Sequence, residues 1–375
     1  MARSRPRPRR PRAVVAMSGG VDSSVAAALL VDEGFDVTGF MLKLWRGEAA
    51  NNDSGCCNVG AAEDARRVAD ALGIRFYVLN FAERFEDTVV RDFHSDYAAG
   101  RTPNPCVRCN QWVKFGALFE RAKALGAEVF ATGHYARVRR AAEGWRLYRG
   151  MDEAKDQSYV LWMLNQHHLS GTRFPVGEQT KAETREIAAS LGLRTAAKPD
   201  SQEICFVPGG DVARYVDSAI PAAAVPGDVV DAQGRVLGRH GGIGHFTVGQ
   251  RKGLGISLGV PVYVTGIDAA SRTVQVGVRA DLGVKGLVAA EASFVGPVPP
   301  MGTPVLVQHR AHGEIHPAVM GEVSGRRVDV NYESSADAMA RGQSAVFYSA
   351  ADPDRVLGGG IVEATAPVGV VGTSV

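Results

Sequence analysis

A glycine-rich turn between two apolar segments constrains the fold of this chain more than any other feature. Residues 13–17 are apolar and predict a buried strand, residues 18–20 read Ser-Gly-Gly, and residues 21–32 carry apolar side chains at helical spacing. Strands that alternate with helices predict a parallel α/β sheet with right-handed crossovers. The alternation continues with predicted strands at 36–44, 75–80 and 129–132 and predicted helices at 61–72, 81–97, 114–125, 158–165 and 181–191.

The composition changes after about residue 209. From Pro226 onward glycine is frequent, and turn signals separate short β-branched runs such as 260–266 and 274–278. We therefore predict an α/β parallel-sheet domain followed by two small β domains, the last of them a β-barrel. The expected boundaries are a disordered tail at 1–12, the α/β domain at 13–209, a central β-rich domain at 210–285 and the barrel at 286–375.

The first twelve residues hold six arginines and three prolines, a composition that predicts a solvated tail rather than an arm for gripping RNA. The whole chain has a net charge of +2, so the rest of it carries about −4, and any RNA site must be a local patch. No apolar run is long enough to span a bilayer, and the start lacks the apolar core of a signal peptide. We expect a soluble, cytoplasmic protein without membrane contact.

Residues 18–24, Ser-Gly-Gly-Val-Asp-Ser-Ser, suit the binding of an anion. Glycines let the backbone approach a ligand, and N–H groups at a helix N-terminus together with serine hydroxyls hold phosphate oxygens. A turn used only for packing is the alternative, but packing does not require this order of residues, and the lysine of a Walker motif is absent. The segment resembles the PP-loop of ATP pyrophosphatases, which release pyrophosphate and leave AMP on their substrate.

This resemblance implies ATP and Mg²⁺ as cofactors. Asp22 is expected to help position Mg²⁺, since a hard cation prefers carboxylate and phosphate oxygens, and no further metal site is expected in the protein itself. Two of the implied residues, Met41 and Gly133, follow later strands, where ligands bind in open α/β sheets. The residues implied in ATP binding are Ala16, Met17, Ser18, Gly19, Gly20, Val21, Asp22, Ser23, Met41 and Gly133.

Two cysteine-bearing segments narrow the resemblance to one family. Residues 100–110, Gly-Arg-Thr-Pro-Asn-Pro-Cys-Val-Arg-Cys-Asn, and residues 198–206, Lys-Pro-Asp-Ser-Gln-Glu-Ile-Cys-Phe, resemble signature segments of the bacterial tRNA 2-thiouridylases of the PP-loop superfamily. Further matching segments at 131–135, 155–159, 174–177 and 247–255 extend the resemblance over nearly the whole chain.

The family resemblance implies that Cys109 is the catalytic nucleophile and that Cys205 carries sulfur as a persulfide. Two thiols suit this chemistry, because one holds the sulfane sulfur and the other attacks it, closing a Cys109–Cys205 disulfide. Arg101, Arg108 and Lys198 would favour the thiolate forms if they lie nearby. The alternative is that Cys205 is a buried core cysteine.

Cys106 departs from the best-known form of the motif, which has an aspartate three residues before the nucleophile, so any acid-base role of that aspartate is not carried over. Five cysteines in a chain without export signals disfavour a structural disulfide framework. The adjacent Cys56 and Cys57 are a poor chelating pair for zinc. An iron–sulfur cluster on Cys106, Cys109 and Cys205 stays open as an alternative.

The resemblance also implies tRNA as the partner. A base modified inside an anticodon loop has to be splayed out into a pocket, which suits a rigid loop with two prolines. The residues implied in tRNA contacts are Asn104, Pro105, Cys106, His134, Lys155, Asp156, Gln157, Arg310, Ala311 and Gln343.

The implied activity is that of a tRNA-uridine 2-sulfurtransferase. ATP would adenylate O2 of the wobble uridine, and persulfide sulfur would replace that oxygen with release of AMP and pyrophosphate. A cysteine desulfurase or persulfide relay protein is the expected sulfur donor, and we expect a monomer. The alternatives are an amide ligase, which needs no cysteines, an iron–sulfur tRNA thiolase, which would be brown and oxygen-sensitive, and a non-catalytic RNA-binding protein that holds ATP without releasing pyrophosphate.

Overall fold

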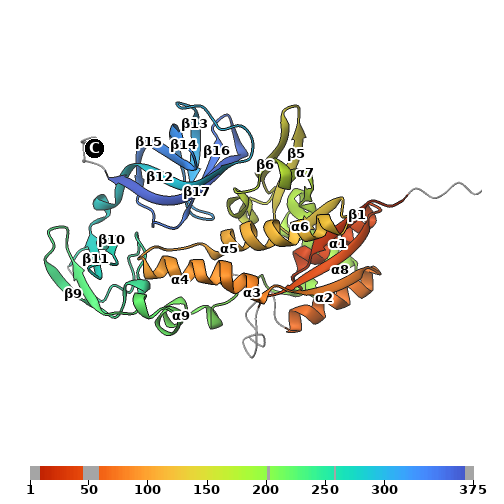
Figure 1. Cartoon of the computed structure of the whole chain (residues 1–375), viewed down its shortest axis with the longest axis horizontal. Coiled ribbons are helices and arrows are strands. Elements are labelled where there is room, and N and C mark those ends of the chain that lie inside the picture. The colour runs from red at the N-terminus through yellow and green to blue at the C-terminus, as the bar shows by residue number, and fades with distance from the viewer. Residues whose placement is uncertain (1–8, 45–58, 201–202, 257–258, 368–375) are drawn as a thin grey trace, which may run out of the picture.

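The computed structural model describes residues 9–44, 59–200, 203–256 and 259–367. In these residues an N-terminal α/β unit, a small β sheet and a β-barrel lie around a pair of long central helices (Figure 1). Cys56, Cys57 and the first eight residues of the expected tail lie outside the described residues. None of the described helices is long and apolar enough to cross a membrane.

The N-terminal unit is built on a parallel sheet whose described strands have the order β3-β2-β1-β4-β7. β1 lies in the middle, because its apolar residues Ala13, Val14 and Val15 are buried on both faces. The strand begins at Arg12, which was expected in the tail, because Arg12 pairs with Asp36. The strands are β1 (Arg12–Ala16), β2 (Asp36–Lys43), β3 (Arg75–Asn80), β4 (Val129–Thr132) and β7 (Thr172–Arg173), and one face packs against α1 (Val21–Asp32), α2 (Val59–Leu72) and α8 (Lys181–Ser190).

Two long helical segments pack against the other face of the sheet and form the centre of the molecule (Figure 1). The second begins well before the expected residue 114, because Asn104 caps it: Val107 N–H donates to Asn104 Oδ1 at 3.3 Å, and Pro105 occupies the first turn. The first runs through α3 (Ala82–Phe85), a π-helical stretch (Glu86–Val90) and α4 (Arg91–Ala98), and the second through α5 (Pro105–Arg108), a π-helical stretch (Cys109–Leu118) and α6 (Phe119–Ala124).

The predicted helix at 158–165 is wrong. The structure has only a 3₁₀ turn there, Ser158–Leu161, followed by the short helix α7 (Gln166–Ser170). Tertiary hydrogen bonds explain the difference, because Tyr159 OH donates to Ser344 O at 2.9 Å and Trp162 Nε1 donates to Ser344 Oγ at 3.1 Å. These bonds draw both aromatic side chains toward the barrel, and the apolar spacing of this segment reflects complete burial rather than a helix face.

The second half of the chain is β-rich, as predicted. After α9 (Val212–Ala219), a four-stranded sheet of order β10-β11-β8-β9 precedes a six-stranded antiparallel barrel that closes by pairing of β12 with β17. The small sheet comprises β8 (Gly227–Val230), β9 (Val236–His240), β10 (Tyr263–Asp268) and β11 (Thr273–Gly277). The barrel comprises β12 (Gly283–Phe294), β13 (Pro304–Gln308), β14 (Ile315–Ser324), β15 (Arg327–Asp337), β16 (Ser344–Ser349) and β17 (Asp352–Pro367).

A hairpin that was not predicted joins the first and last units. Strands β5 (Ala136–Ala141) and β6 (Gly144–Arg149) follow β4 in the chain, yet β6 pairs with β17 of the barrel at Tyr148 and Leu147. Arg149 strengthens this junction, because its guanidinium lies 3.7 Å from the ring centroid of Tyr348 in β16. The hairpin therefore fixes the barrel against the α/β unit.

His309, directly after β13, makes the stability of the barrel sensitive to acid. The side chain is 6% exposed and stacks on His316 with a centroid distance of 4.8 Å, and neither nitrogen of the His309 ring has a hydrogen-bond partner. Burial, followed by the nearby His316 and Arg310, lowers the pKa of His309 to about 4. The unfolded chain binds this proton near pH 6.5, so stability is complete above that pH and falls as the pH drops toward 4.

We expect acidification from pH 7 to pH 5 to cost the native state about 2 kcal/mol through His309 alone. His309→Gln removes this titration, so its free energy of unfolding should fall less between these two pH values in urea titrations. His312→Gln, at an exposed residue of the same turn, is the matched control and should behave like the wild type. An equal acid loss in the wild type and His309→Gln would refute this assignment.

Candidate functional site

The glycine-rich turn between β1 and α1 is tightly packed. Neither Gly19 in the turn nor Gly133 beside it leaves room for a Cβ atom. Gly19 has φ +72°, and a Cβ there would lie 2.2 Å from Ala61 O in α2. A Cβ on Gly133, after β4, would lie 2.5 Å from Ser23 N. The absence of side chains at Gly19 and Gly133 therefore brings α2 and the end of β4 against the N-terminus of α1.

Serines hold the turn in shape. Ser18 N–H donates to Ser23 Oγ at 3.1 Å, while Ser23 Oγ and Ser24 Oγ donate to Gly20 O at 3.1 and 2.8 Å. Gly20 is the N-cap of α1 and supplies no capping side chain. The turn therefore presents the N-terminal end of α1, a favourable place for a phosphate group.

The structure places the remaining residues implied in nucleotide binding beside this turn. Ala16 ends β1, and Met17 N–H donates to Phe40 O of β2 at 2.8 Å. The last residue pair between β1 and β2 is Ala16 with Phe40, so Met41 lies just beyond the end of β1. Its side chain is 2% exposed, so a ligand would meet the backbone of Met41 rather than its thioether.

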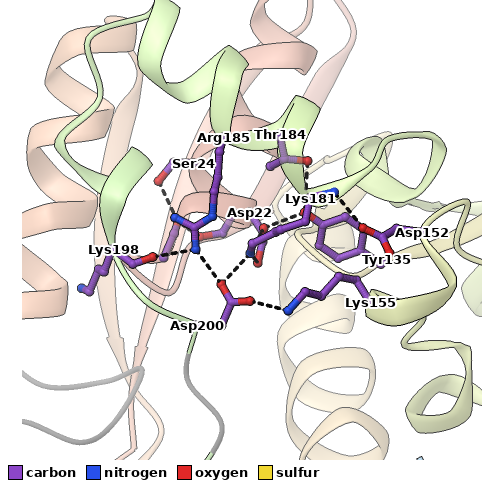
Figure 2. A network of polar contacts seen from close by, with 12 residues as sticks. Asp22, Ser24, Tyr135, Asp152, Lys155, Lys181, Thr184, Arg185, Lys198 and Asp200 are labelled. Atoms are coloured by element: carbon purple, nitrogen blue, oxygen red, sulfur yellow. Dashed lines mark hydrogen bonds and ion pairs between the residues drawn. The ribbon is translucent and has the colours of Figure 1, made fainter. Parts of the chain in front are cut away.

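Asp22, in the first turn of α1, is held by two side chains that were not predicted (Figure 2). Lys181 Nζ lies 2.7 and 2.9 Å from the two carboxylate oxygens, and Tyr135 OH donates to Oδ1 at 2.9 Å. Lys181 is the first residue of α8, which begins with a capping box formed by Thr180 and Glu183. A well-defined helix start thus directs an ammonium group at Asp22.

Asp200 joins the same network. Its carboxylate lies 2.9 Å from Lys155 Nζ, 2.8 Å from Lys181 Nζ and 3.2 Å from Arg185 Nη2 (Figure 2). Partial burial raises the pKa of Asp200, but hydrogen bonds from Lys181 and Lys155 outweigh burial and lower it overall. Asp200 is therefore a carboxylate at neutral pH and occupies the centre of a group of cations.

The three described cysteines differ in exposure. Cys106 is exposed, Cys109 is buried at the start of the π-helical stretch, and Cys205 is half-buried. Cys205 packs against the same apolar core that includes Cys109, and its neighbour Phe206 meets Phe93 edge to face at 4.9 Å. The described residues contain no group of three or more histidine, cysteine or acidic side chains arranged to hold a metal ion.

The cations expected to favour the thiolates each have a carboxylate partner. Arg101 Nε donates to Asp96 at 2.7 Å. Arg108 makes two 2.7 Å hydrogen bonds to Glu291 in β12. Lys198 lies 2.8 Å from Asp64 in α2. Because these pairs are close to neutral, we do not assign the three cations a role in lowering the pKa of a thiol.

Lys198 instead contacts the glycine-rich turn. Its ammonium donates to Gly19 O at 3.1 Å, so the beginning of the 198–206 segment is attached to the turn itself. Ser201 and Gln202 of this segment lie outside the described residues.

The residues implied in tRNA contacts differ in exposure and in the contacts they make. Cys106, Arg310 and Ala311 are exposed. Gln343 makes an internal contact: its Nε2 donates to Thr102 O at 2.9 Å. This hydrogen bond holds the segment that leads to α5. The barrel therefore supports the loop that carries Asn104, Pro105 and Cys106.

Three of these residues, Pro105, His134 and Asp156, are buried. Asp156 is 8% exposed and accepts hydrogen bonds from the backbone N–H groups of Gly150 and Ser158, both at 3.0 Å. His134 is 8% exposed, and burial followed by the charge of Lys114 holds its pKa well below the usual value, so it is neutral. Their direct effect in this structure is to shape the turns around them.

The remaining two, Lys155 and Gln157, flank Asp156. Lys155 pairs with Asp200, and Gln157 Oε1 accepts a hydrogen bond from Tyr135 N–H at 3.0 Å. The 155–157 segment therefore connects directly to the charge network around Asp22.

Comparison with known proteins identifies the family. Family models match residues 11–209 ("tRNA methyl transferase HUP domain"), 213–278 ("tRNA methyl transferase PRC-barrel domain") and 284–362 ("Aminomethyltransferase beta-barrel domain"). A 4-thiouridine synthetase in complex with RNA and ATP is similar to the chain with a TM-score of 0.36 and 17% identity, covering 56% of this chain and 50% of that one.

Curated relatives are far more similar. The tRNA-specific 2-thiouridylase MnmA of Geotalea uraniireducens is 46% identical over 95% of this chain and 96% of its own length. The protein of the same name from Acidothermus cellulolyticus is 48% identical over 94% of this chain and 98% of its own length. Since such relatives match nearly end to end, the chain belongs to the family of tRNA-specific 2-thiouridylases.

Proposed function

We propose that this protein is a tRNA-uridine 2-sulfurtransferase that activates O2 of the wobble uridine with ATP and replaces it with sulfur carried by Cys205. The observation that carries the proposal is the connection between the glycine-rich turn and the segment of Cys205, made by Lys198 at Gly19 and by Lys181 between Asp22 and Asp200. A phosphate-binding turn and a sulfur carrier joined in this way suit a two-stage reaction.

The names of the family models mention methyl transfer, whereas those of the relatives mention thiolation. The residues favour thiolation. A PP-loop supports adenylation, which a methyl donor does not need, and the cysteine pair suits transfer of sulfur.

The turn suits the phosphates of ATP, because the N-terminus of α1 offers backbone N–H groups and the glycines allow close approach of the backbone. Mg²⁺ usually binds one or two carboxylates plus substrate phosphates, and Asp22 at the first turn of α1 fits that requirement. Bound there, Mg²⁺ would neutralise charge on the leaving pyrophosphate. Lys181, which already lies against Asp22, supplies a second positive charge for the same region.

The reaction divides into activation and displacement. Uridine O2 attacks the α-phosphorus of ATP, pyrophosphate leaves, and the N3 proton is lost. The terminal sulfur of the Cys205 persulfide then attacks C2 and forms a C2–S bond, and AMP leaves with the former O2 atom. Attack of the Cys109 thiolate on the Cys205 sulfur breaks the S–S bond, and the electron pair of that bond stays with the sulfur on C2. N3 then regains a proton, which gives 2-thiouridine. The two cysteines end as a disulfide, which an external thiol reduces.

The proposal includes a persulfide-donating protein, either a cysteine desulfurase or a relay protein, and a cytoplasmic location where such donors and tRNA meet. Cys106, Arg310 and Ala311 are the exposed residues that we propose contact tRNA. His134, Asp156 and Gln343 are proposed to act mainly by shaping the pocket for the base, since their side chains are engaged within the protein.

A heavy-oxygen label at O2 of the target uridine tests the activation step. If O2 attacks ATP, the label is found in the AMP that leaves, and mass spectrometry of the nucleotide detects it. Label released as water, with unlabelled AMP, would contradict adenylation of O2.

Gly19→Ala tests the nucleotide turn. The added Cβ meets Ala61 O and the positive φ disfavours alanine, so the turn has to move. We expect ATP affinity in calorimetric titration to fall by about tenfold or more, as for a lost set of phosphate hydrogen bonds. Gly34→Ala is the matched control, because Gly34 has φ +88° with no atom near its Cβ position. Each variant should lose about 1 kcal/mol of stability from φ, and an equal ATP affinity in both would refute the role of the turn.

A further inference from the structure

A cluster of charges joins three segments that lie far apart in the sequence (Figure 2). Lys155 belongs to the 155–157 segment, Lys181 and Arg185 belong to α8, and Asp200 comes five positions before Cys205. The Asp200 carboxylate is the point at which the three cations meet, with distances of 2.8 to 3.2 Å. None of these contacts follows from the spacing of residues along the chain.

Two of the cations that bind Asp200, Arg185 and Lys181, are themselves held in place by other contacts. Arg185 Nη1 donates to Ala196 O at 2.6 Å and Arg185 Nη2 donates to Lys198 O at 3.0 Å, so its guanidinium is attached to the backbone just before Asp200. Lys181 is 11% exposed at its side chain and bridges Asp200 to Asp22. The position of Asp200 is therefore defined relative to the nucleotide turn.

In the sequence, Cys205 lies between Asp200, which forms polar contacts, and Phe206, which forms apolar contacts. After Cys205, Phe206 is 6% exposed and contacts the rings of Phe85 and Phe93 at 5.9 and 4.9 Å. Phe206 attaches the segment after Cys205 to the central helices, and Asp200 attaches the segment before Cys205 to the charge network around Asp22.

We propose that Asp200 is a positioning residue for sulfur transfer: through Lys181 and Lys155 it holds the segment that bears Cys205 at the nucleotide site. The proposal rests on the function proposed above. Asp200 forms ion pairs with Lys155, Lys181 and Arg185, so its effect is exerted through these cations. Its loss should impair delivery of sulfur and leave activation of the uridine nearly intact, because Lys181 keeps its contact with Asp22.

The test compares Asp200→Asn, Asp200→Glu and the wild type in two half-reactions. Asn keeps the size of the side chain but loses the charge, and Glu restores the charge. We expect Asp200→Asn to lower 2-thiouridine formation about 100-fold, as for a displaced reacting group, with tRNA-dependent pyrophosphate release changed less than about threefold. Asp200→Glu should recover most of the thiolation. Asp36→Asn, which removes an exposed pair with Arg75 at the far end of β2, is the matched control.

Alkylation of Cys205 by iodoacetamide, measured by mass spectrometry, does not depend on enzymatic activity. It therefore tests the positioning role of Asp200 separately from the proposed thiolation. Asp200→Asn should raise the alkylation rate of Cys205 about fivefold through local loosening, while Cys106 reacts as in the wild type. An unchanged Cys205 rate, or an equal fall of both half-reactions, would overturn the positioning role. A wild type that makes no 2-thiouridine, with Cys205 alkylation still dependent on Asp200, would refute the proposed function and leave the positioning role standing.

Discussion

Cys205→Ser is expected to abolish 2-thiouridine formation while tRNA-dependent release of pyrophosphate continues. A serine hydroxyl does not form a persulfide, so sulfur has no carrier, and the rate of thiolation should fall by about 10³-fold or more. Activation of the uridine precedes the need for sulfur and depends on the turn at 18–24. The two rates are measured on the same samples, by nucleoside mass spectrometry and by a pyrophosphate assay.

Cys109→Ser provides the informative comparison. It should still load a persulfide on Cys205, visible as added sulfur in the mass of the intact protein, yet fail to pass the sulfur to tRNA. The half-buried position of Cys205 allows a donor to reach it, whereas Cys109 is buried. Thiolation by Cys205→Ser at the wild-type rate would exclude the carrier role of Cys205 and favour a thiolation mechanism that does not use this cysteine.

Asp22→Asn should impair activation of the uridine and leave loading of sulfur on Cys205 intact. The variant loses the negative charge that we propose positions Mg²⁺ beside the pyrophosphate, and it also loses the ion pair with Lys181. We expect pyrophosphate release to fall by about 10² to 10³-fold, the usual range for loss of one electrostatic contact to the transition state. Persulfide loading on Cys205 should continue, because it does not involve ATP.

Asp32→Asn is the control for Asp22→Asn, since Asp32 is an exposed residue at the opposite end of the same helix. The control should release pyrophosphate at the wild-type rate. A fall in persulfide loading in Asp22→Asn would show that the substitution damages the protein as a whole, and unchanged pyrophosphate release would remove Asp22 from the nucleotide site.

Short-range patterns predicted the elements around the glycine-rich turn, where we propose that ATP binds. The apolar strand, the Ser-Gly-Gly turn and the helix after it are consecutive in the chain, so local physics suffices to place residues 18–24 at a helix N-terminus. The start of the second central helix at Pro105, rather than at residue 114, could also have been predicted. Asn104 and Pro105 are typical of the N-cap and first positions of a helix.

The charge network of Asp22, Lys181 and Asp200 could not be predicted from local sequence patterns. Thr180 and Glu183 form a capping box that marks the start of α8, yet nothing in that pattern tells which carboxylate Lys181 will meet. The contacts of Lys181 with Asp22 and Asp200 depend on how α8 packs beside α1 and on where the 198–206 segment returns. Tertiary packing also decided the 158–165 segment, where burial on all sides gave a helix-like pattern without a helix.

The most direct test of the central claim is nucleoside mass spectrometry of unmodified tRNA after incubation with the purified wild-type protein, ATP, Mg²⁺ and a persulfide donor. We predict 2-thiouridine at the wobble position, formed only when ATP is present and accompanied by AMP and pyrophosphate. Absence of 2-thiouridine with an active donor, or its formation without ATP, would contradict it.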